Sequence, residues 1–152
     1  MARIVSALMI TGDRYPALVR LSIPCFLSQT YERRELIVVD DGATTSRHAI
    51  PNDPRIHYIR SQRKLPIGAK WTIALEAAEG DVFCFWGDDD WQHPTRISCQ
   101  LEHLNRGANG LNDVPYVDLR NGRRYIFSID VGGTTEVPTR EARSRDLPLD
   151  GT

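Results

Sequence analysis

The feature of this sequence that most constrains its fold is a set of short apolar segments, each followed at once by a polar, glycine-containing turn. Residues 4–10, 35–39 and 81–86 are nearly continuous apolar runs. Runs of this length are typical of strands that are covered on both faces, as strands in a parallel sheet are. We therefore expect three buried strands, and residues 55–59 resemble a further one.

Helical patterns occupy the segments between these strands. Residues 13–29 carry an approximate apolar stripe, although Pro24 should kink or interrupt that helix. Residues 66–80 predict a second helix, with Pro66 in its first turn and Gly80 as its stop, and residues 94–107 predict a third. The expected apolar face of the second helix consists of Ile67, Trp71, Ala74, Leu75 and Ala78.

This alternation of strands and helices predicts an α/β/α sandwich around a mainly parallel sheet. Ligands of such sheets bind beyond the carboxyl ends of the strands. Three polar turns, at residues 11–13, 40–42 and 87–90, directly follow predicted strands. We therefore expect them to converge on one edge of the sheet.

The last third of the chain differs in character. Asn121 and Gly122 lie between two strand-like segments, residues 115–119 and 124–129, which is a strong signal for a hairpin. Residues 131–152 contain few large apolar side chains and predict an irregular tail. We expect residues 1–107 to form the α/β domain and residues 108–152 to form no independent domain.

Composition excludes several classes of function. The net charge of −1 over 152 residues argues against a general binder of nucleic acid or of anionic membranes. No apolar run approaches the ~20 residues that a membrane-spanning helix needs. The three cysteines lack metal-ligand spacing and are expected to be reduced thiols of a cytoplasmic protein. No P-loop motif occurs, and the absence of GxGxxG after the first predicted strand disfavours a dinucleotide-dependent oxidoreductase.

Three adjacent carboxylates, Asp88, Asp89 and Asp90, are the most informative chemical feature. They repel one another unless water or a cation compensates their charges. Mg²⁺ and Mn²⁺ prefer oxygen ligands and often use only one or two protein carboxylates, while substrate phosphates complete the shell. The triplet predicts either a divalent metal site, with His93 as a weaker further candidate, or a solvated turn that caps the helix at Pro94.

A second acidic turn and a basic stretch supply the other candidates. Asp40 could accept a hydrogen bond from a nucleobase N–H, although an Asp-Gly pair is also a common turn. The basic residues between the two acidic turns are Arg60, Arg63, Lys64 and Lys70. They could meet a diphosphate that a metal carries, or form a solvated face.

Three stretches together resemble the family 2 glycosyltransferases of GT-A fold. They are VSALMITGDRY from Val5, QTYERRELIVVDDG from Gln29 and PIGAKWTIALEAAEGDVFCFWGDDDWQHP from Pro66. Each is weak alone, but their order and spacing are specific. The resemblance covers about residues 3–105 and implies a nucleotide-sugar donor, with uracil as the expected base, and inverting transfer to an unknown saccharide, lipid or protein acceptor.

The resemblance also implies roles for individual residues. Thr11 and Lys70 would belong to the donor site, with Lys70 near the diphosphate. Asp40 would contact the base, assisted by Arg60 or Arg63. Asp88 would approach the ribose and, with Asp89 and Asp90, supply carboxylates for Mn²⁺ or Mg²⁺. The metal would stabilise the negative charge that develops on the departing diphosphate.

The sequence departs from the family pattern in three ways. Trp71-Thr72 stands where Arg-Asn is usual, and Gly87 stands where an additional Asp is common. The acceptor-side acidic pair that would supply the catalytic base is not recognisable, so we assign that base to no residue. Two alternatives stay open: a nucleotide-sugar binding module without catalysis, and a metal-dependent nucleotidyltransferase or phosphohydrolase.

Overall fold

The computed structural model describes residues 3–13, 16–104, 113–117 and 122–128. The chain divides into two compact units, Met1–His103 and Leu104–Thr152.

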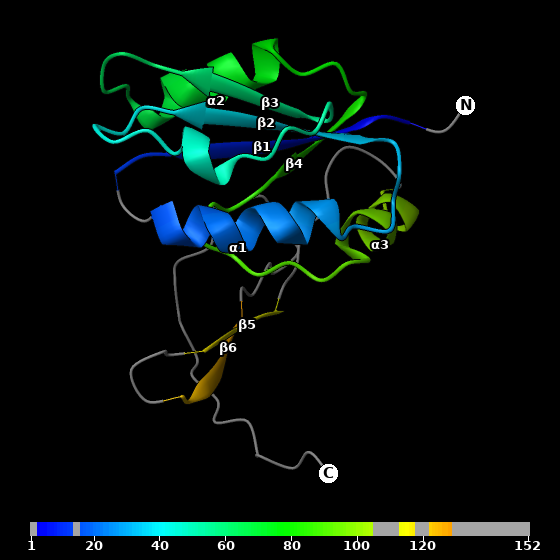
Figure 1. The fold of residues 1–152 in the computed structure, drawn as a ribbon. Helices are drawn as coiled ribbons and strands as arrows, with labels where there is room; N and C mark the ends of the chain where they lie inside the picture. The colour runs from blue at the N-terminus through cyan, green and yellow to red at the C-terminus, as the bar shows by residue number, and fades with distance from the viewer. Residues whose placement is uncertain (1–2, 14–15, 105–112, 118–121, 129–152) are drawn as a thin grey trace, which may run out of the picture. The chain divides into compact units, whose positions relative to one another are not determined.

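The first unit is built on a four-stranded parallel sheet (Figure 1). Its strands are β1 (Val5–Thr11), β2 (Arg34–Asp40), β3 (Ile56–Arg60) and β4 (Val82–Phe85). They are ordered β3-β2-β1-β4, and the register aligns the last residue of β1 with the last residue of β2 and that of β3. The carboxyl ends of these strands therefore meet at one edge, and the predicted α/β class is confirmed.

Helices cover both faces of this sheet, with α1 on one side and α2 on the other (Figure 1). The helices are α1 (Pro16–Leu27), α2 (Ile67–Glu76) and α3 (Arg96–Glu102), and a short 3-10 helix (Arg47–Ala49) follows β2. The alternation of side chains along each strand sorts the core into two parts. The sequence pattern did not predict the 3-10 helix.

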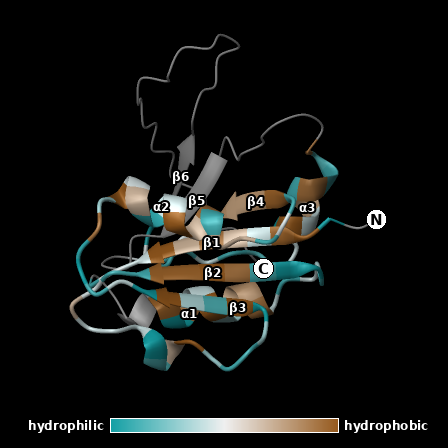
Figure 2. Cartoon of the chain, turned by 90° about the horizontal axis from the view of Figure 1, so that it is seen from above, coloured by the Kyte–Doolittle hydropathy of each residue, from teal (hydrophilic) through white to brown (hydrophobic). Residues whose placement is uncertain are grey.

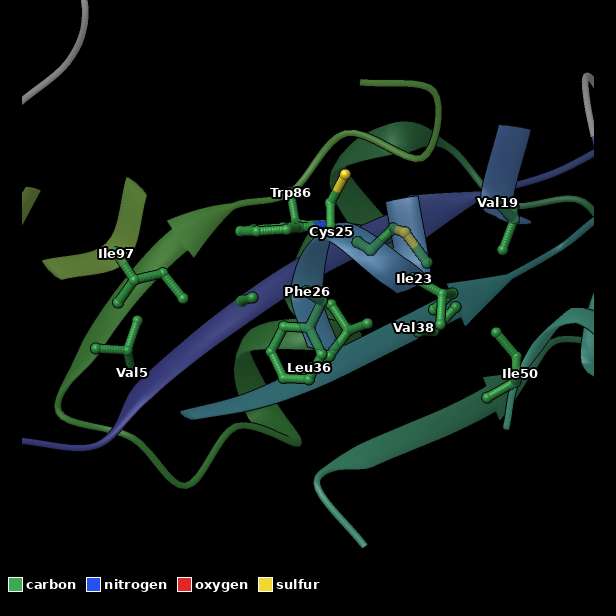
Figure 3. Packing of buried hydrophobic residues seen from close by; sticks show 12 residues of the cluster. Val5, Val19, Ile23, Cys25, Phe26, Leu36, Val38, Ile50, Trp86 and Ile97 are labelled. Carbon is green, nitrogen blue, oxygen red and sulfur yellow. The ribbon is translucent and has the colours of Figure 1, made fainter. Parts of the chain in front are cut away.

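Alternate residues of β1 and β2 face the two helical layers. Ala7 and Met9 pack toward α1 with Phe26 and Trp86, whose rings meet edge to face at 6.0 Å (Figure 3). Leu8 packs on the opposite face, toward α2. The two central strands are thus covered on both sides, as their continuous apolar sequence predicts.

Helix boundaries differ from the sequence expectation in three places. Helix α1 continues through Pro24. Proline has no N–H to donate to the carbonyl of Arg20, four residues earlier. Both residues are exposed, so water can solvate that carbonyl. Helix α2 ends at Glu76 rather than at Gly80. Helix α3 begins at Arg96 and ends at Glu102, and the predicted continuation at residues 105–107 lies outside the described residues.

Gly80 is required by a close approach of the backbone rather than by a helix end. A Cβ atom at this position would lie 2.4 Å from Oγ of Ser6 on β1. The Gly80 N–H donates to that same hydroxyl at 2.9 Å. The glycine therefore lets the chain pass close to β1 before it enters β4.

Part of the apolar face predicted for α2 is wrong, because Ile67 and Leu75 are 66% and 46% exposed while Lys70 is buried. Ala74 of that face is buried, as expected. The expectation that β4 is covered on both faces is also wrong. Phe83 and Phe85 are 50% and 69% exposed. Strand β4 lies at the edge of the sheet, so its hydrophobic sequence, visible in Figure 2, is not matched by full burial.

The second unit contains a two-stranded antiparallel hairpin of β5 (Asp113–Val117) and β6 (Arg124–Ser128). Gly122 between them has a φ of 71°, a conformation that glycine adopts without steric cost. The predicted hairpin is confirmed, and the predicted tail at residues 131–152 lies outside the described residues.

The expectations of reduced cysteines and of no membrane-spanning helix can be compared with the described residues. All three cysteines carry free thiols, and burial raises the pKa of Cys84 to about 11. None of the helices in the described residues combines the length and the apolar character that crossing a bilayer requires.

The end of α1 depends on one buried arginine. Arg34 donates hydrogen bonds to the carbonyl oxygens of Phe26, Leu27 and Tyr31, and its guanidinium lies 5.2 Å from the centre of the Phe26 ring. A cation at the carboxyl end of a helix satisfies carbonyls that have no helical partner.

We therefore predict that Arg34→Met lowers the free energy of unfolding by about 2–3 kcal/mol, because it removes hydrogen bonds from a charged donor. Urea unfolding followed by circular dichroism measures this loss. Arg33→Met at the exposed neighbouring position is the matched control and should change stability little. Equal losses in the two variants would contradict the capping role.

Candidate functional site

The site begins where β1 and β4 end. Thr11 is the last residue of β1, and its hydroxyl donates to Oδ2 of Asp88 at 2.7 Å. Asp88 follows β4 and is 77 residues away in the sequence. The Trp86 N–H donates to the Leu8 carbonyl at 2.8 Å, which holds the chain beside β1 up to the start of the acidic turn. Thr11 and Asp88 therefore come together as predicted.

Lys70 brings the first turn and the second turn together. Its ammonium group, on α2, donates to the Thr11 carbonyl at 3.2 Å and to Oδ1 of Asp41 at 3.0 Å. The lysine side chain is 9% exposed and that of Asp41 is fully buried. A buried charge of this kind requires a partner of opposite charge. The pair therefore fixes α2 over the ends of β1 and β2.

Asp41 accepts further hydrogen bonds besides that of Lys70. The Leu65 N–H donates to Oδ2 at 3.0 Å, and Lys64 Nζ lies 3.3 Å from Oδ1. Burial by itself raises the pKa of Asp41, but the Leu65 N–H, Lys70 and Lys64 together outweigh it and hold the pKa at about 2. Asp41 is therefore ionised at neutral pH and ties the segment before α2 to the end of β2.

Asp40 is saturated with donors inside the protein. Its carboxylate accepts hydrogen bonds from the N–H groups of Gly42 and Ser46, the hydroxyl of Tyr58 and the guanidinium of Arg60. Burial raises its pKa, but these donors, led by Tyr58, lower it overall. Because the side chain is completely buried, Asp40 organises the turn after β2. Its contact with a nucleobase stays a prediction.

The two arginines proposed beside Asp40 differ in position. Arg60 ends β3, pairs with Asp40 at 2.9 Å and also donates to the Gly42 carbonyl. Arg63 is exposed, and its guanidinium has no hydrogen-bond partner among the residues that the structure describes. The structure thus brings Arg60 into the network and does not bring Arg63 into it.

The acidic triplet is open to water at its second and third members. Asp88 is partly exposed, and Asp89 and Asp90 are exposed. Partial desolvation, together with repulsion from Asp89 and Asp88, raises the pKa of Asp90, and the positive charge of Arg96 opposes that rise. The carboxylates therefore carry a mutual repulsion that a cation would relieve.

Gly87 leaves room for the side chain of Asp90. A Cβ atom at position 87 would lie 2.1 Å from Oδ2 of Asp90. An aspartate there, as in the family pattern, would therefore require the exposed Asp90 side chain to turn away.

The donor groups that are present limit how this edge could bind a metal. Within the described part of the chain, no three His, Cys, Asp or Glu side chains are grouped so that they could hold a metal ion. The triplet therefore does not form a three-ligand cluster. One or two carboxylate ligands completed by phosphate oxygens are the usual arrangement for Mg²⁺ in such sites, and the oxygen donors here fit it.

His93 and the two tryptophans have other surroundings. Nδ1 of His93 lies 2.8 Å from the Thr95 hydroxyl and accepts a hydrogen bond from the Thr95 N–H at 3.2 Å, so it stabilises the turn before α3. Trp86 is buried in the core, and Trp91 is 64% exposed. The interpretation of His93 as part of a helix start is favoured over that of a ligand.

Sequence reasoning missed Tyr58, and it placed Asp13 in the first polar turn without giving it a role. Tyr58 lies two residues before Arg60 on β3, so period-two alternation places both on the face of Asp40. Asp13 accepts hydrogen bonds from the N–H groups of Ala43 and Thr44, which joins the first two turns. Nothing in the sequence signals the Asp13 contacts, because they depend on the spacing of two loops.

The family comparison matches almost the whole chain. The family model described as glycosyl transferase family 2 covers residues 6–149. The chain belongs to this family. Its resemblance to family 2, first inferred from three motifs, is thereby confirmed.

Similar curated proteins are glycosyltransferases by name. The putative colanic acid biosynthesis glycosyl transferase WcaA of Escherichia coli is 32% identical over 105 residues, which are 66% of this chain and 37% of WcaA. An uncharacterized glycosyltransferase of Rickettsia felis is 24% identical over 73% of this chain and 19% of its own length. The glucosyltransferase WfaP of E. coli, whose full name includes UDP-Glc, is 33% identical over 51% of this chain and 32% of WfaP. The family 2 chain thus spans well under half of each relative.

Similar solved structures share the fold. The mannosyltransferase PcManGT of Pyrobaculum calidifontis, in complex with GDP-Man and Mn²⁺, has a TM-score of 0.61 at 17% identity over 80% of this chain and 37% of that one. TarS 1–349 of S. aureus, in complex with UDP, has a TM-score of 0.55 at 16% identity over 79% of this chain and 43% of that one. The GT-A-like fold expected from the sequence is confirmed.

The depressed pKa of Asp41 makes a prediction about stability and pH. A carboxyl group whose pKa falls from 3.8 when unfolded to about 2 when folded stabilises the native state above pH 4. That contribution, about 2 kcal/mol, is lost as the pH falls from about 4 to about 2. The difference in unfolding free energy between the natural chain and Asp41→Asn should therefore shrink over this range.

Urea unfolding at several pH values between 6 and 2.5 measures that difference. Glu32→Gln, at an exposed position, is the control and should differ from the natural chain by the same small amount at each pH. A difference for Asp41→Asn that does not vary with pH would contradict the ionised, buried state of Asp41.

Proposed function

We propose that this chain is the donor-binding part of a glycosyltransferase that binds a UDP-sugar with a divalent metal and transfers the sugar with inversion. The observation that carries the proposal is the joining of Thr11, Asp88 and Lys70 at the carboxyl edge of a parallel sheet. This edge is where open α/β sheets bind ligands. Family membership supports sugar transfer as the reaction.

The basic and polar groups at this edge support a nucleotide as the ligand. Lys70 has two hydrogen bonds to protein acceptors, which leaves one of its three N–H donors for a diphosphate oxygen. Arg60, held by Asp40, supplies a guanidinium beside the expected position of the base. UDP is favoured over GDP by the resemblance and by the UDP-Glc in the name of WfaP.

Asp88 and one of the two exposed carboxylates, Asp89 or Asp90, would hold the metal. The oxygen donors and their mutual repulsion fit Mn²⁺ or Mg²⁺, and Mn²⁺ is present in the PcManGT complex. When bound, such a metal stabilises the charge of the departing diphosphate. The role of Thr11 is to orient Asp88 through its hydroxyl.

Inversion requires a general base on the acceptor side of the donor sugar. The last third of the chain offers three carboxylates, Asp130, Glu136 and Asp150, which lie outside the described residues, and the base is assigned to none of them. The acceptor, whether a saccharide, a lipid or a protein, would bind against that side. The described edge is proposed to bind the donor and to activate the leaving group.

Titration calorimetry of UDP with Mn²⁺ and with a chelator tests this proposal. UDP should bind more tightly with Mn²⁺, because the carboxylates and the diphosphate otherwise repel each other. Asp88→Asn should remove most of that gain, about tenfold or more in affinity. Asp81→Asn is the matched control, since Asp81 lies at the opposite end of the strands, where it accepts from the Ile4 N–H.

Equal UDP affinity with Mn²⁺ and with chelator would contradict the proposal that the acidic triplet binds a divalent metal. Titrations of GDP and CMP under the same conditions test the choice of base, and tighter binding of either would overturn UDP.

The products of incubation with UDP-glucose distinguish sugar transfer from phosphorus chemistry. We expect UDP to be released, even if only slowly by transfer to water. Chromatography of the nucleotides measures this. UMP or pyrophosphate as the product would indicate a phosphohydrolase or nucleotidyltransferase instead.

A further inference from the structure

One face of α1 and the residue just beyond its end contact the chain that carries the acidic triplet. Ser22 and Cys25 lie three residues apart on α1, and Gln29 lies two residues beyond its end. All three are buried. Each has a hydrogen-bond partner between residues 87 and 97. The rest of the buried helix surface is apolar and packs on the sheet.

Gln29 makes the most extensive of these contacts. Its side-chain amide donates to the His93 carbonyl at 2.7 Å and to the Cys25 carbonyl at 3.1 Å. Its amide oxygen accepts from the Ile97 N–H at 3.1 Å. The residue is only 5% exposed, so its amide forms these hydrogen bonds with the protein in place of hydrogen bonds with water.

The other end of the acidic turn is held by Ser22. Its hydroxyl donates to the Gly87 carbonyl at 2.5 Å, and its own carbonyl accepts from the Trp86 indole at 3.2 Å. Between the two anchors, the Gln92 N–H donates to the Cys25 sulfur at 3.4 Å (Cys25 and Trp86 are labelled in Figure 3). Hydrogen bonds to α1 therefore hold both ends of the segment from Asp88 to Trp91.

We infer that Gln29 is a positioning residue for the metal-binding carboxylates Asp88, Asp89 and Asp90. This inference rests on the proposed function, because it assigns Gln29 to that same site. No part of Gln29 reaches the carboxylates; it acts by fixing the backbone on their carboxyl-terminal side. Leaving the N–H and C=O groups of a buried side-chain amide without hydrogen bonds costs free energy. This cost favours the one arrangement of the backbone at His93 and Ile97 in which both groups of Gln29 are paired.

The chemistry of the amide explains why this position is a glutamine. Its partners are two carbonyl oxygens and one N–H group, which need donors and an acceptor from a single side chain. Glutamate would present acceptors to both carbonyls. Methionine has similar length and apolar character but cannot form these hydrogen bonds.

Two measurements on Gln29→Met test the inference. Hydrogen exchange should become faster in residues 87–97 while β1 keeps its protection, because only the acidic turn loses its anchor. The gain in UDP affinity from Mn²⁺ should fall by about 10- to 100-fold, as for other groups that orient metal ligands, while the metal-free affinity stays unchanged. Ser6→Ala is the matched control, because it removes buried hydrogen bonds to Glu35 and Gly80 at the other end of the sheet.

The outcomes separate this inference from the proposed function. If the natural chain shows no gain from Mn²⁺, the proposed function fails, and exchange in residues 87–97 still decides whether Gln29 fixes that segment. If Mn²⁺ assists binding equally in the natural chain and in Gln29→Met, or if Ser6→Ala loses the same gain, the inference is overturned. Should Gln29→Met fail to fold, slow exchange of the Ile97 amide in the natural chain supports the anchor, and fast exchange there overturns it.

Discussion

The buried ion pair between Lys70 and Asp41 is the interaction on which the rest of the site depends. The ammonium group bonds to a carboxylate at the end of β2 and to a carbonyl at the end of β1, so one charge joins two strands and a helix. Removing either partner would leave an uncompensated buried charge. The contacts of Asp41 with Leu65 and of Thr11 with Asp88 extend this arrangement to the chain before α2 and to the end of β4.

Much of the fold could be predicted because hydrophobic patterning reports burial directly. The continuous apolar runs of β1 and β2 correspond to strands covered on both faces. The pattern failed for β4, since an edge strand can carry the same residues with Phe85 largely exposed. It failed again on α2, where Lys70 is buried and Ile67 is not, because a lysine with a buried carboxylate partner can replace an apolar side chain.

The site could be predicted at the level of turns but not of hydrogen bonds. The rule that ligands bind at carboxyl strand ends places Thr11, Asp40 and Asp88 on one edge, and the structure brings them there. It could not tell that Asp40 is saturated by Tyr58, Ser46, Gly42 and Arg60, while Asp41 takes the lysine. Adjacent aspartates are equivalent in a sequence and are distinguished only by the loops that fold over them. The same holds for Gln29, two of whose three partners are 64 and 68 residues away.

Paramagnetic relaxation by Mn²⁺ tests most directly whether this edge of the sheet binds the metal-nucleotide complex. Amide signals of the isotopically labelled chain are recorded with Mn²⁺ alone and with Mn²⁺ plus UDP. With UDP, broadening should be strongest at Gly12, Gly87 and Asp88 and weakest at Ser6 and Gly80, at the opposite end of the strands. Broadening that is unaffected by UDP, or that is strongest at the opposite end, would contradict the account.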